Sequence, residues 1–577
     1  MFRRLLKYIT GDKGMLAAAA LFALLGSGLG LAAPVIFGSA IDAISAFQMA
    51  ELLRLLLLLS LVYIFSALLQ WAVPLLSARV AGHTVERLRH EIFSKLNKLP
   101  VKFFDTHKHG DIMSTLTNDM DSISDGISQS LDQILTGAVT VLGTLVIMFF
   151  INVYIALAVL IITPVSIFIA KYITTHSSKM FREQQRLVGS LGAFGEETVS
   201  GMKTVKAFGS EAENGKHFTG INGELCKAAQ KAQFYSSLVN PTTRVINNLS
   251  YIAVGVLGSL LVLNGGGKMT VGTIATMLTY ATQFAKPINE ITAVTTQLQN
   301  ALAGCRRVFA LLDEQEEAPD PLPACELAGV KGEVRFDRVR FGYTPERTLI
   351  ENMNLETAPG KVVAIVGPTG SGKTTVVNLL MRFYDPQEGT IAIDGIPIAK
   401  VTRESLRRSI TMVLQDTWLF QGTIHENIAY GRPDATREEV EQAAKEAYAH
   451  SFIMKLPQGY DTVISGDGSG LSQGQQQLLT IARAMLADAP ILVLDEATSS
   501  VDLRTEQKIQ KAFNAIMQGH TCFVIAHRLS TIKNADAIIV IKDGRIQEQG
   551  THRELLARNG LYASIYNSQF AGRKHIM

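Results

Sequence analysis

The first 300 residues alternate between long uncharged apolar runs and stretches rich in charge. A helix needs about 20 apolar residues to cross the hydrocarbon core of a bilayer, and four of the runs have that length. A longer uncharged run, residues 133–170, predicts two helices joined by a tight turn at Asn152. The pattern therefore predicts six spans, at residues 14–38, 55–78, 133–151, 153–170, 245–267 and 269–292.

The sixth predicted span is the least apolar, because Lys286, Pro287 and Glu290 interrupt it. Ionisable side chains at membrane depth are costly, so Lys286 and Glu290, one helical turn apart, are expected to face the bundle interior or a water-filled cavity. Two interpretations stay open: a contact on a substrate pathway, or an ion pair that supports helix packing.

The basic residues predict the orientation of these spans. Residues 79–132 carry seven Lys and Arg and residues 171–244 carry ten, whereas the connections near Asp42, Asn152 and Lys268 carry one between them. Positive residues collect on the cytoplasmic side, which places both long segments and both termini in the cytoplasm of a bacterial-type inner or plasma membrane. The first apolar run is longer than the core of a signal sequence, so we expect it to stay as a span.

The two basic segments are too long to be structureless loops and are rich in helix-forming residues. Each is expected to form two helices that leave the membrane and return. The predicted tips of these helical pairs are residues 111–119 and residues 201–208.

The pattern of apolar and polar residues changes after the sixth predicted span. An acidic, proline-rich stretch from Asp313 to Pro323 cannot easily continue a helix and reads as a linker. Beyond it, short apolar runs alternate with helical stretches, which is typical of an α/β fold with a mostly parallel sheet. The predicted strands include residues 362–366, 491–494, 523–526 and 537–541. The expected organisation is an all-α six-helix transmembrane domain at residues 1–312, a linker at 313–331 and an α/β P-loop domain at 332–577.

Composition agrees with one membrane part and one soluble part. Hydrophobic residues make up 47% of the 577 residues and charged residues 18%, with a mean hydropathy of +0.20. The net charge of +3 is too small to indicate a nucleic-acid partner, since the basic residues have a topological explanation. The four cysteines show no metal-ligand or disulfide spacing and are interpreted as packing residues.

A phosphate-binding motif opens the chemistry of the C-terminal part. Residues 367–374, Gly-Pro-Thr-Gly-Ser-Gly-Lys-Thr, follow a predicted strand and precede a helical stretch. In this motif, backbone amides cradle phosphates, Lys373 reaches the terminal phosphate oxygens, and the Thr374 hydroxyl ligates Mg²⁺.

An acidic motif further along the chain completes the set of residues expected at a nucleotide-hydrolysing site. The apolar run 491–494 ends in Asp495, where a Mg²⁺ contact is needed, and Glu496 points to the other side, toward an attacking water. Tyr343, Gln415 and His527 are each unremarkable alone; the strength of the pattern lies in their order around the phosphate loop.

With the run Leu-Ser-Gln-Gly-Gln at residues 471–475, the chain resembles the exporter-type transporters of the ATP-binding cassette (ABC) family over practically its whole length. The resemblance implies that Tyr343 stacks on adenine, Gln415 touches Mg²⁺ and senses the membrane domain, Glu496 activates water, and His527 contacts the γ-phosphate. It also implies that Ser472 and Gly474 bind ATP held by another subunit, with Asp502 communicating between sites. The implied nucleotide-binding residues are Tyr343, Gly367, Pro368, Thr369, Gly370, Ser371, Gly372, Lys373, Thr374, Thr375, Ser472, Gly474, Gln475 and Asp502. The implied catalytic residues are Lys373, Gln415, Glu496 and His527. The implied metal ligands are Thr374, Gln415 and Asp495.

A helix that begins near Ser472 offers free amides and a positive dipole end to an anion. The phosphate loop of the same domain already occupies one side of ATP, so these amides are expected to serve a partner domain. Because the chain has one such domain, the working unit is expected to be at least a dimer with two ATP sites.

Two features depart from the usual family pattern. Gln473 stands where the signature commonly has glycine, and residues 464–470 lack the Glu-Arg-Gly run of many homodimeric exporters. Neutral drift is one explanation. The favoured one is that the chain is one subunit of a heterodimer, whose own phosphate loop supplies the hydrolysing site.

The expected function is ATP-driven export of an amphipathic small molecule, lipid or peptide across a lipid bilayer. An ATP-gated channel or regulator and an exporter-fold importer remain alternatives, although the intact Glu496 and His527 weigh against a regulator. A soluble ATPase acting on DNA shares the signature logic, but six spans exclude it.

Overall fold

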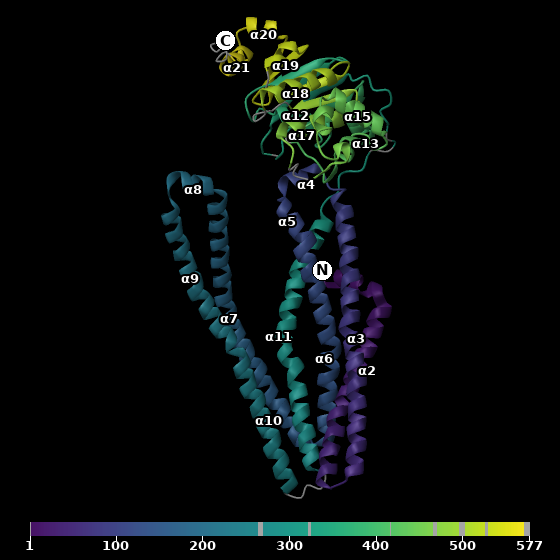
Figure 1. The fold of residues 1–577 in the computed structure, drawn as a ribbon, viewed down its shortest axis with the longest axis vertical. Helices are drawn as coiled ribbons and strands as arrows, with labels where there is room; N and C mark the ends of the chain where they lie inside the picture. The colour runs from purple at the N-terminus through teal and green to yellow at the C-terminus, as the bar shows by residue number, and fades with distance from the viewer. Residues whose placement is uncertain are drawn as a thin grey trace. The chain divides into compact units, whose positions relative to one another are not determined.

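The computed structural model describes residues 2–263, 269–320, 323, 325–344, 346–415, 417–465, 470–495, 502–525 and 529–570. It divides into two compact units (Figure 1). The helical unit comprises Met1–Leu99 and His107–Gln315, and the α/β unit comprises Pro100–Thr106 and Glu316–Met577. The short helix between residues 100 and 106 thus belongs by its contacts to the α/β unit, although its chain neighbours lie in the helical unit.

Long helices build the helical unit. In chain order they are α1 (Phe2–Ile9), α2 (Lys13–Ser45), α3 (Met49–Leu96), α5 (His109–Ser114), a π-helical turn (Thr115–Asp119), α6 (Met120–Ile151), α7 (Val153–Ser200), α8 (Met202–Phe208), α9 (Glu211–Ser237), α10 (Val239–Leu263) and α11 (Val271–Asp313). Helices α2, α3, α6 and α11 pack on one another, while α7 packs against α9 and α10 in a separate arm (Figure 1).

Four predicted spans lie within α2, α3, α6 and α7, the fifth overlaps α10 up to Leu263, and the sixth overlaps α11 from Val271 onward. Among the described residues, five helical stretches are long and apolar enough to cross a membrane: Arg3–Ser45, Met49–Leu96, His109–Ile151, Val153–Ser200 and Glu211–Leu263. Helix α11 carries the sixth predicted span, and its polar and charged residues keep it outside that set. The sixth span therefore stays a prediction.

The tight turn predicted at Asn152 is present. The Asn152 side chain caps α7 by accepting hydrogen bonds from the backbone N–H groups of Tyr154 (3.0 Å) and Ile155 (3.2 Å). An N-cap satisfies amides that the helix itself leaves without partners, so α6 can end and α7 begin within one residue.

The C-terminal end of α2 lies close to the first turn of α11. A Cβ on Gly272 would lie 2.0 Å from the carbonyl oxygen of Gly38, so only glycine permits this contact. The Asp42 carboxylate then accepts hydrogen bonds from the Thr270 hydroxyl (2.6 Å) and the Gly272 N–H (2.8 Å). Asp42 thereby ties the end of α2 to the first turn of α11.

Of the two predicted helical tips, one is present where predicted and the other is not. The turn at residues 201–208 is present as α8, which ends at Gly209 with a left-handed φ of 64°. The other prediction is wrong: residues 111–119 lie in α5 and the π-helical turn, on the return path. The chain turns earlier, around α4 (Val101–Thr106), because Pro100 stops α3 while Gly110 is accommodated inside a helix.

The α/β unit contains two main sheets. The antiparallel sheet has the order β2-β1-β4-β5, and the larger sheet has the order β12-β11-β3-β10-β9-β6, parallel except for the β11–β12 pair. The strands are β1 (Val334–Phe341), β2 (Ile350–Thr357), β3 (Val362–Val366), β4 (Glu388–Ile393), β5 (Ile396–Pro397), β6 (Ile410–Val413), β9 (Ile491–Asp495), β10 (Thr521–Ile525), β11 (Ala537–Lys542) and β12 (Arg545–Gly550), with a small pair β7 (Gly422–Thr423) and β8 (Val463–Ile464). The predicted strands correspond to β3, β9, β10 and β11.

Helices cover the larger sheet and its surroundings. They are α12 (Lys373–Leu380), α13 (Arg403–Arg408), α14 (Ile424–Ala429), α15 (Arg437–Glu446), α16 (His450–Ile453), α17 (Gln473–Ala487), α18 (Leu503–Ile516), α19 (Leu529–Asn534), α20 (His552–Ala557) and α21 (Leu561–Phe570). Alternate residues of the central strands enter two apolar cores: Leu492 and Val524 pack with α17 and α18, whereas Val493 and Phe523 pack with α12. Strands buried on both faces explain the continuous apolar runs in the sequence.

The acidic stretch after α11 is bound to the α/β unit. Arg403 contacts Glu317 (2.9 Å) and Asp320 (2.7 Å), and Arg407 also contacts Glu317 (3.3 Å). Arg382, only 7% exposed, lies 3.8 Å from Asp320. Residues 316–320 are therefore held in place by ion pairs rather than forming a free tether.

Candidate nucleotide site and membrane cavities

The phosphate loop connects β3 to α12. Gly370 and Gly372 adopt φ angles of 81° and 100°, which other residues rarely reach. A Cβ on Gly367 would lie 2.1 Å from the carbonyl oxygen of Ile541 on the neighbouring strand β11. The loop therefore follows a path that glycine alone allows, and it ends where the free N–H groups of α12 begin. Pro368, Thr369 and Gly370 are exposed, whereas Ser371, Gly372 and Thr375 are buried.

Lys373 lies at the first position of α12. Its ammonium donates hydrogen bonds to the carbonyl oxygens of Gly367 and Pro368, each at 2.9 Å. Burial lowers the pKa of Lys373, and the negative charge of Asp495 partly opposes this effect. Lys373 and Asp495 are thus brought to the same end of the parallel sheet, as their motifs predict.

Three residues with oxygen donors suited to Mg²⁺ lie at or just beyond the ends of α12, β9 and β6. The Thr374 hydroxyl is exposed in the first turn of α12, and Asp495, 9% exposed, ends β9. The Gln415 side chain is exposed just after β6. Hydroxyl, carboxylate and amide oxygens are the donors that Mg²⁺ takes together with nucleotide phosphates, so these residues fit the ion. The described residues hold no cluster of three His, Cys, Asp or Glu side chains, and such a site needs none.

Tyr343 stands beside the phosphate loop and is 38% exposed. Its hydroxyl lies 3.2 Å from the Thr375 hydroxyl and accepts a hydrogen bond from Asn378 at 3.2 Å. The Tyr384 ring meets the Tyr343 ring edge-on, with 5.0 Å between centroids. The ring predicted to stack on adenine is therefore fixed by α12 and by a second tyrosine.

Sequence reasoning did not find Tyr384 or its partner Asp105. The Tyr384 hydroxyl donates a hydrogen bond to the Asp105 carboxylate on α4, within the α/β unit. No motif spacing signals this pair, because 279 positions separate the two residues in the chain.

The run at residues 471–475 forms the start of α17. Ser472 is the N-cap: its hydroxyl accepts from the Gln475 N–H (3.3 Å), and its own N–H donates to the Gln475 side-chain oxygen (2.9 Å). This reciprocal pair is a capping box. Gly474 is buried and Gln473 exposed, so the residue that departs from the family pattern projects from the first turn of the helix.

The loop after Gln415 is connected to the same helix. The Thr417 hydroxyl donates to the Gln476 side-chain oxygen at 3.1 Å. Further along α17, Arg483 donates to the carbonyl oxygens of Asn427 (2.8 Å) and Trp418 (3.2 Å). Burial lowers the pKa of Arg483. Two hydrogen bonds, Thr417–Gln476 and Arg483–Trp418, thus connect the Gln415 loop with α17.

Asp502 is the N-cap of α18. Its carboxylate accepts from the N–H groups of Thr505 and Arg504, both at 3.0 Å, and these bonds lower the pKa of Asp502. Three predicted features lie outside the described residues: Glu496, His527 and residues 466–469 of the loop before α17.

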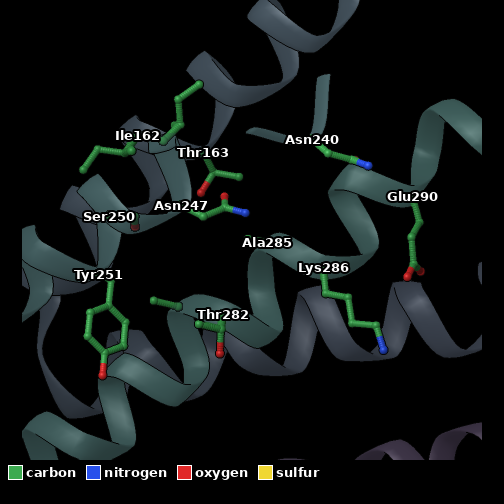
Figure 2. Close-up of a pocket in the computed structure, with 12 residues that line it drawn as sticks. Ile162, Thr163, Asn240, Asn247, Ser250, Tyr251, Thr282, Ala285, Lys286 and Glu290 are labelled. Atoms are coloured by element: carbon green, nitrogen blue, oxygen red, sulfur yellow. The ribbon is translucent and has the colours of Figure 1, made fainter. Parts of the chain in front are cut away.

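Two cavities in the helical unit share a charged edge. One, of about 410 Å³, lies among α7, α10 and α11 and has Asn240, Asn247, Tyr251, Lys286 and Glu290 in its lining (Figure 2). The other, of about 500 Å³, lies among α2, α3, α6 and α11, and its lining also includes Lys286 and Glu290. Figure 2 shows both side chains extending from the same side of α11. Both side chains therefore line cavities, which agrees with the expectation for ionisable groups on a membrane helix.

These features define a class of protein: a P-loop ATPase fused to a bundle of long apolar helices. Two family models match the chain, "ABC transporter transmembrane region" at residues 16–288 and "ABC transporter" at residues 350–499. The chain belongs to the ABC transporter family, as an exporter-type half-transporter and ATP-dependent translocase with several long membrane helices.

Three similar proteins illustrate the relationship. A fatty acid ABC transporter ATP-binding/permease protein of Mycobacterium bovis is 45% identical over 509 residues, covering 88% of this chain and 80% of that protein. An ATP-dependent lipid A-core flippase of Syntrophus aciditrophicus is 36% identical over 572 residues, covering 99% and 94%. The solved structure of a bacterial Atm1-family ABC exporter with ATP bound has a TM-score of 0.78 and 34% identity, covering 97% and 98%.

Proposed function

We propose that this half-transporter pairs with a second half-transporter and exports a lipid-type amphiphile with a long acyl chain. The observation that carries the proposal is the pair of cavities, about 410 and 500 Å³, whose linings on membrane helices mix apolar side chains with a larger number of polar ones and with the charged groups of Asp132, Lys286 and Glu290. Such linings suit a molecule with an apolar tail and a polar headgroup. The names of the fatty acid transporter and of the lipid A-core flippase support the same substrate class.

The ATP site would work through residues of two chains. Tyr343 holds the base, the amides of residues 367–374 and Lys373 hold the phosphates, and the amides at the start of α17 complete the site of the other subunit. Glu496 polarises the attacking water, and His527 contacts the γ-phosphate. Mg²⁺, held by Thr374 and Asp495 with Gln415 nearby, would neutralise charge on the transferred phosphoryl group.

The partner is proposed to be a different chain, so that the complex is a heterodimer. Gln473 replaces a signature glycine, and its side chain is exposed on the first turn of α17, where it would meet ATP bound to the partner. The site built on Lys373 and Asp495 of this chain would hydrolyse ATP, and the other site would turn over more slowly. Asp502 would connect the two sites. In this arrangement the six spans place the α/β unit and both termini in the cytoplasm.

ATP-dependent transport into inverted membrane vesicles tests the proposal. Vesicles from cells that express the chain with its co-purifying partner should take up a radiolabelled long-chain fatty acid when ATP is supplied. A Glu496→Gln variant should bind ATP yet lose uptake and steady-state hydrolysis. Full ATPase activity in that variant would contradict the catalytic assignment, and uptake without ATP would contradict active export.

Subunit composition has its own measurement. Purification of the tagged chain from its native membrane should yield a second, similar polypeptide in equal amount. A fully active complex of one polypeptide would contradict the heterodimer and leave the transport assignment unaffected. An ATP-gated channel is distinguished by ion currents that persist in the Glu496→Gln variant.

A further inference from the structure

Lys286 differs from the other charged side chains around the two cavities. Glu290 accepts a hydrogen bond from the Gln133 side chain at 2.8 Å. Within the part of the chain that the structure describes, no ion pair or hydrogen bond is found for the Lys286 ammonium, and the side chain is exposed to both cavities. An ammonium group at membrane depth gains most from a negatively charged partner.

Lys286, Glu290 and Asp132 are also expected to lie at different depths in the membrane. Lys286 follows the start of α11 at Val271 by 15 residues, which is about 22 Å along the helix, and Glu290 lies about 28 Å along it. Asp132, which lines the larger cavity, lies about 28 Å from the end of α6 at Ile151. In a hydrocarbon core of about 30 Å, both carboxylates are near the inner boundary, and Lys286 is deeper by about one helical turn.

This arrangement has a consequence for the charge of a ligand. A headgroup with one negative charge can contact Lys286 while its tail follows the apolar side chains of the cavity, such as Ile162, Ile246 and Ala281. Lys286 is the one basic residue among the described lining residues of the two cavities, so a second negative charge on the headgroup would have no cationic partner and would meet added repulsion from Glu290 and Asp132. A neutral headgroup would leave the ammonium without a counter-charge.

We propose that Lys286 is the headgroup-binding residue of the transport site and selects amphiphiles whose headgroup carries a single negative charge. The inference rests on the proposed function, since it assigns the substrate site of the same exporter. Two chemical sources share this headgroup property: a free fatty carboxylate and a lipid with a phosphodiester.

Five probes with long alkyl chains separate these possibilities. The full protein with its co-purified partner is reconstituted in phosphatidylcholine vesicles at pH 8, and ATPase stimulation is titrated with palmitate, lysophosphatidylglycerol, hexadecanol, hexadecyl phosphate and hexadecyltrimethylammonium. We expect palmitate or lysophosphatidylglycerol to act at concentrations at least ten-fold below those of the neutral, dianionic and cationic probes. Which of the two is stronger identifies the source of the headgroup.

Variants at Lys286 then test the residue. Lys286→Gln should remove the ten-fold preference, Lys286→Arg should keep it, and Lys286→Glu should shift it toward the cationic probe. Lys171→Gln is the matched control, because Lys171 is an exposed lysine of α7, about 27 Å from its start at Val153, that lines neither cavity. It should retain the preference. Size-exclusion profiles and ATP binding show whether each variant is folded.

The outcomes separate the two levels of the proposal. A preference that survives in Lys286→Gln, or stimulation that ignores headgroup charge in the unmodified protein, would overturn the Lys286 site and leave lipid export standing. Stimulation by none of the five probes in a preparation that hydrolyses ATP would contradict the proposed function and this site together.

Discussion

Tyr384 joins the predicted adenine platform to helix α4 through one side chain. Its ring meets Tyr343 edge-on at 5.0 Å between centroids, and its hydroxyl donates a hydrogen bond to Asp105. Burial, followed by this bond, raises the pKa of Tyr384. Because α4 lies between α3 and α5 in the chain, a shift of Tyr343 on nucleotide binding would reach these two helices through a few residues of backbone.

We predict that Tyr384→Phe weakens this route while sparing ATP binding. The ring contact with Tyr343 remains, so ATP affinity should change by no more than about two-fold, whereas stimulation of ATPase by transported substrate should fall several-fold. A double-mutant cycle with Asp105→Ala should give a coupling energy of about 1 kcal/mol or more in thermal unfolding, the usual scale for such a hydrogen bond. Additive effects of the two substitutions would contradict the connection. Tyr343→Phe, which keeps both rings, is the control for ATP binding.

The sequence predicted features that depend on neighbouring residues. The phosphate loop, strands β3, β9, β10 and β11, and the Asn152 turn all follow from short patterns whose physical cause is local. Features that depend on distant residues were not predictable in this way. Arg403 contacts Asp320, which lies 83 positions away in the chain, and Tyr384 contacts Asp105, which lies 279 positions away.

Two local judgements also needed the structure. The tip was predicted at residues 111–119, but these residues are helical, and the chain turns earlier, around α4, after Pro100. For Lys286, the sequence placed the residue in the sixth predicted span and left open whether it contacts a substrate or forms an ion pair. In the structure, Glu290 accepts a hydrogen bond from Gln133, whereas Lys286 lines both cavities. The spacing of the two residues on one helix does not reveal this difference.

Gly367→Ala should disable the nucleotide site through backbone geometry rather than chemistry. The added methyl would lie 2.1 Å from the Ile541 carbonyl oxygen and 2.8 Å from the Ser371 hydroxyl oxygen, so β3 and the loop must move apart from β11. We expect ATP affinity to fall at least ten-fold, measured with a fluorescent nucleotide. Thr369→Ala, at an exposed position of the same loop, keeps the backbone amide that faces the phosphates, so it is the control and should bind ATP within about three-fold of the original chain. Normal ATP binding in Gly367→Ala would contradict the rigid contact between β3 and β11.

Substitutions at the start of α17 should separate helix capping from ATP turnover. Ser472→Ala removes one half of the capping box with Gln475 and should destabilise the α/β unit by about 1 kcal/mol. Gln473→Gly, at an exposed first-turn position, should change the free energy of unfolding by less than that. If Gln473 slows the site that it completes, Gln473→Gly should raise the ATPase rate of the assembled complex. Chemical unfolding and steady-state hydrolysis measure the two effects, and an unchanged rate would favour neutral drift at this position.

His552 should make the C-terminal helical pair sensitive to acid. Its ring Nδ1 lies 2.6 Å from the Tyr562 hydroxyl, and burial, together with the charges of Lys533 and Arg553, lowers the pKa of His552 below the ordinary 6.5. Burial also raises the pKa of Tyr562, so the phenol stays protonated and donates to the neutral imidazole. The unfolded chain binds a proton more readily than the folded one, so the stabilisation is complete above about pH 6.5 and declines as the pH falls below that value. Hydrogen exchange of α20 and α21, corrected for the intrinsic pH dependence of exchange, should accelerate between pH 7.5 and 5.5, and His552→Gln should abolish most of this difference. Equal acceleration in both proteins would assign the acid sensitivity to other groups.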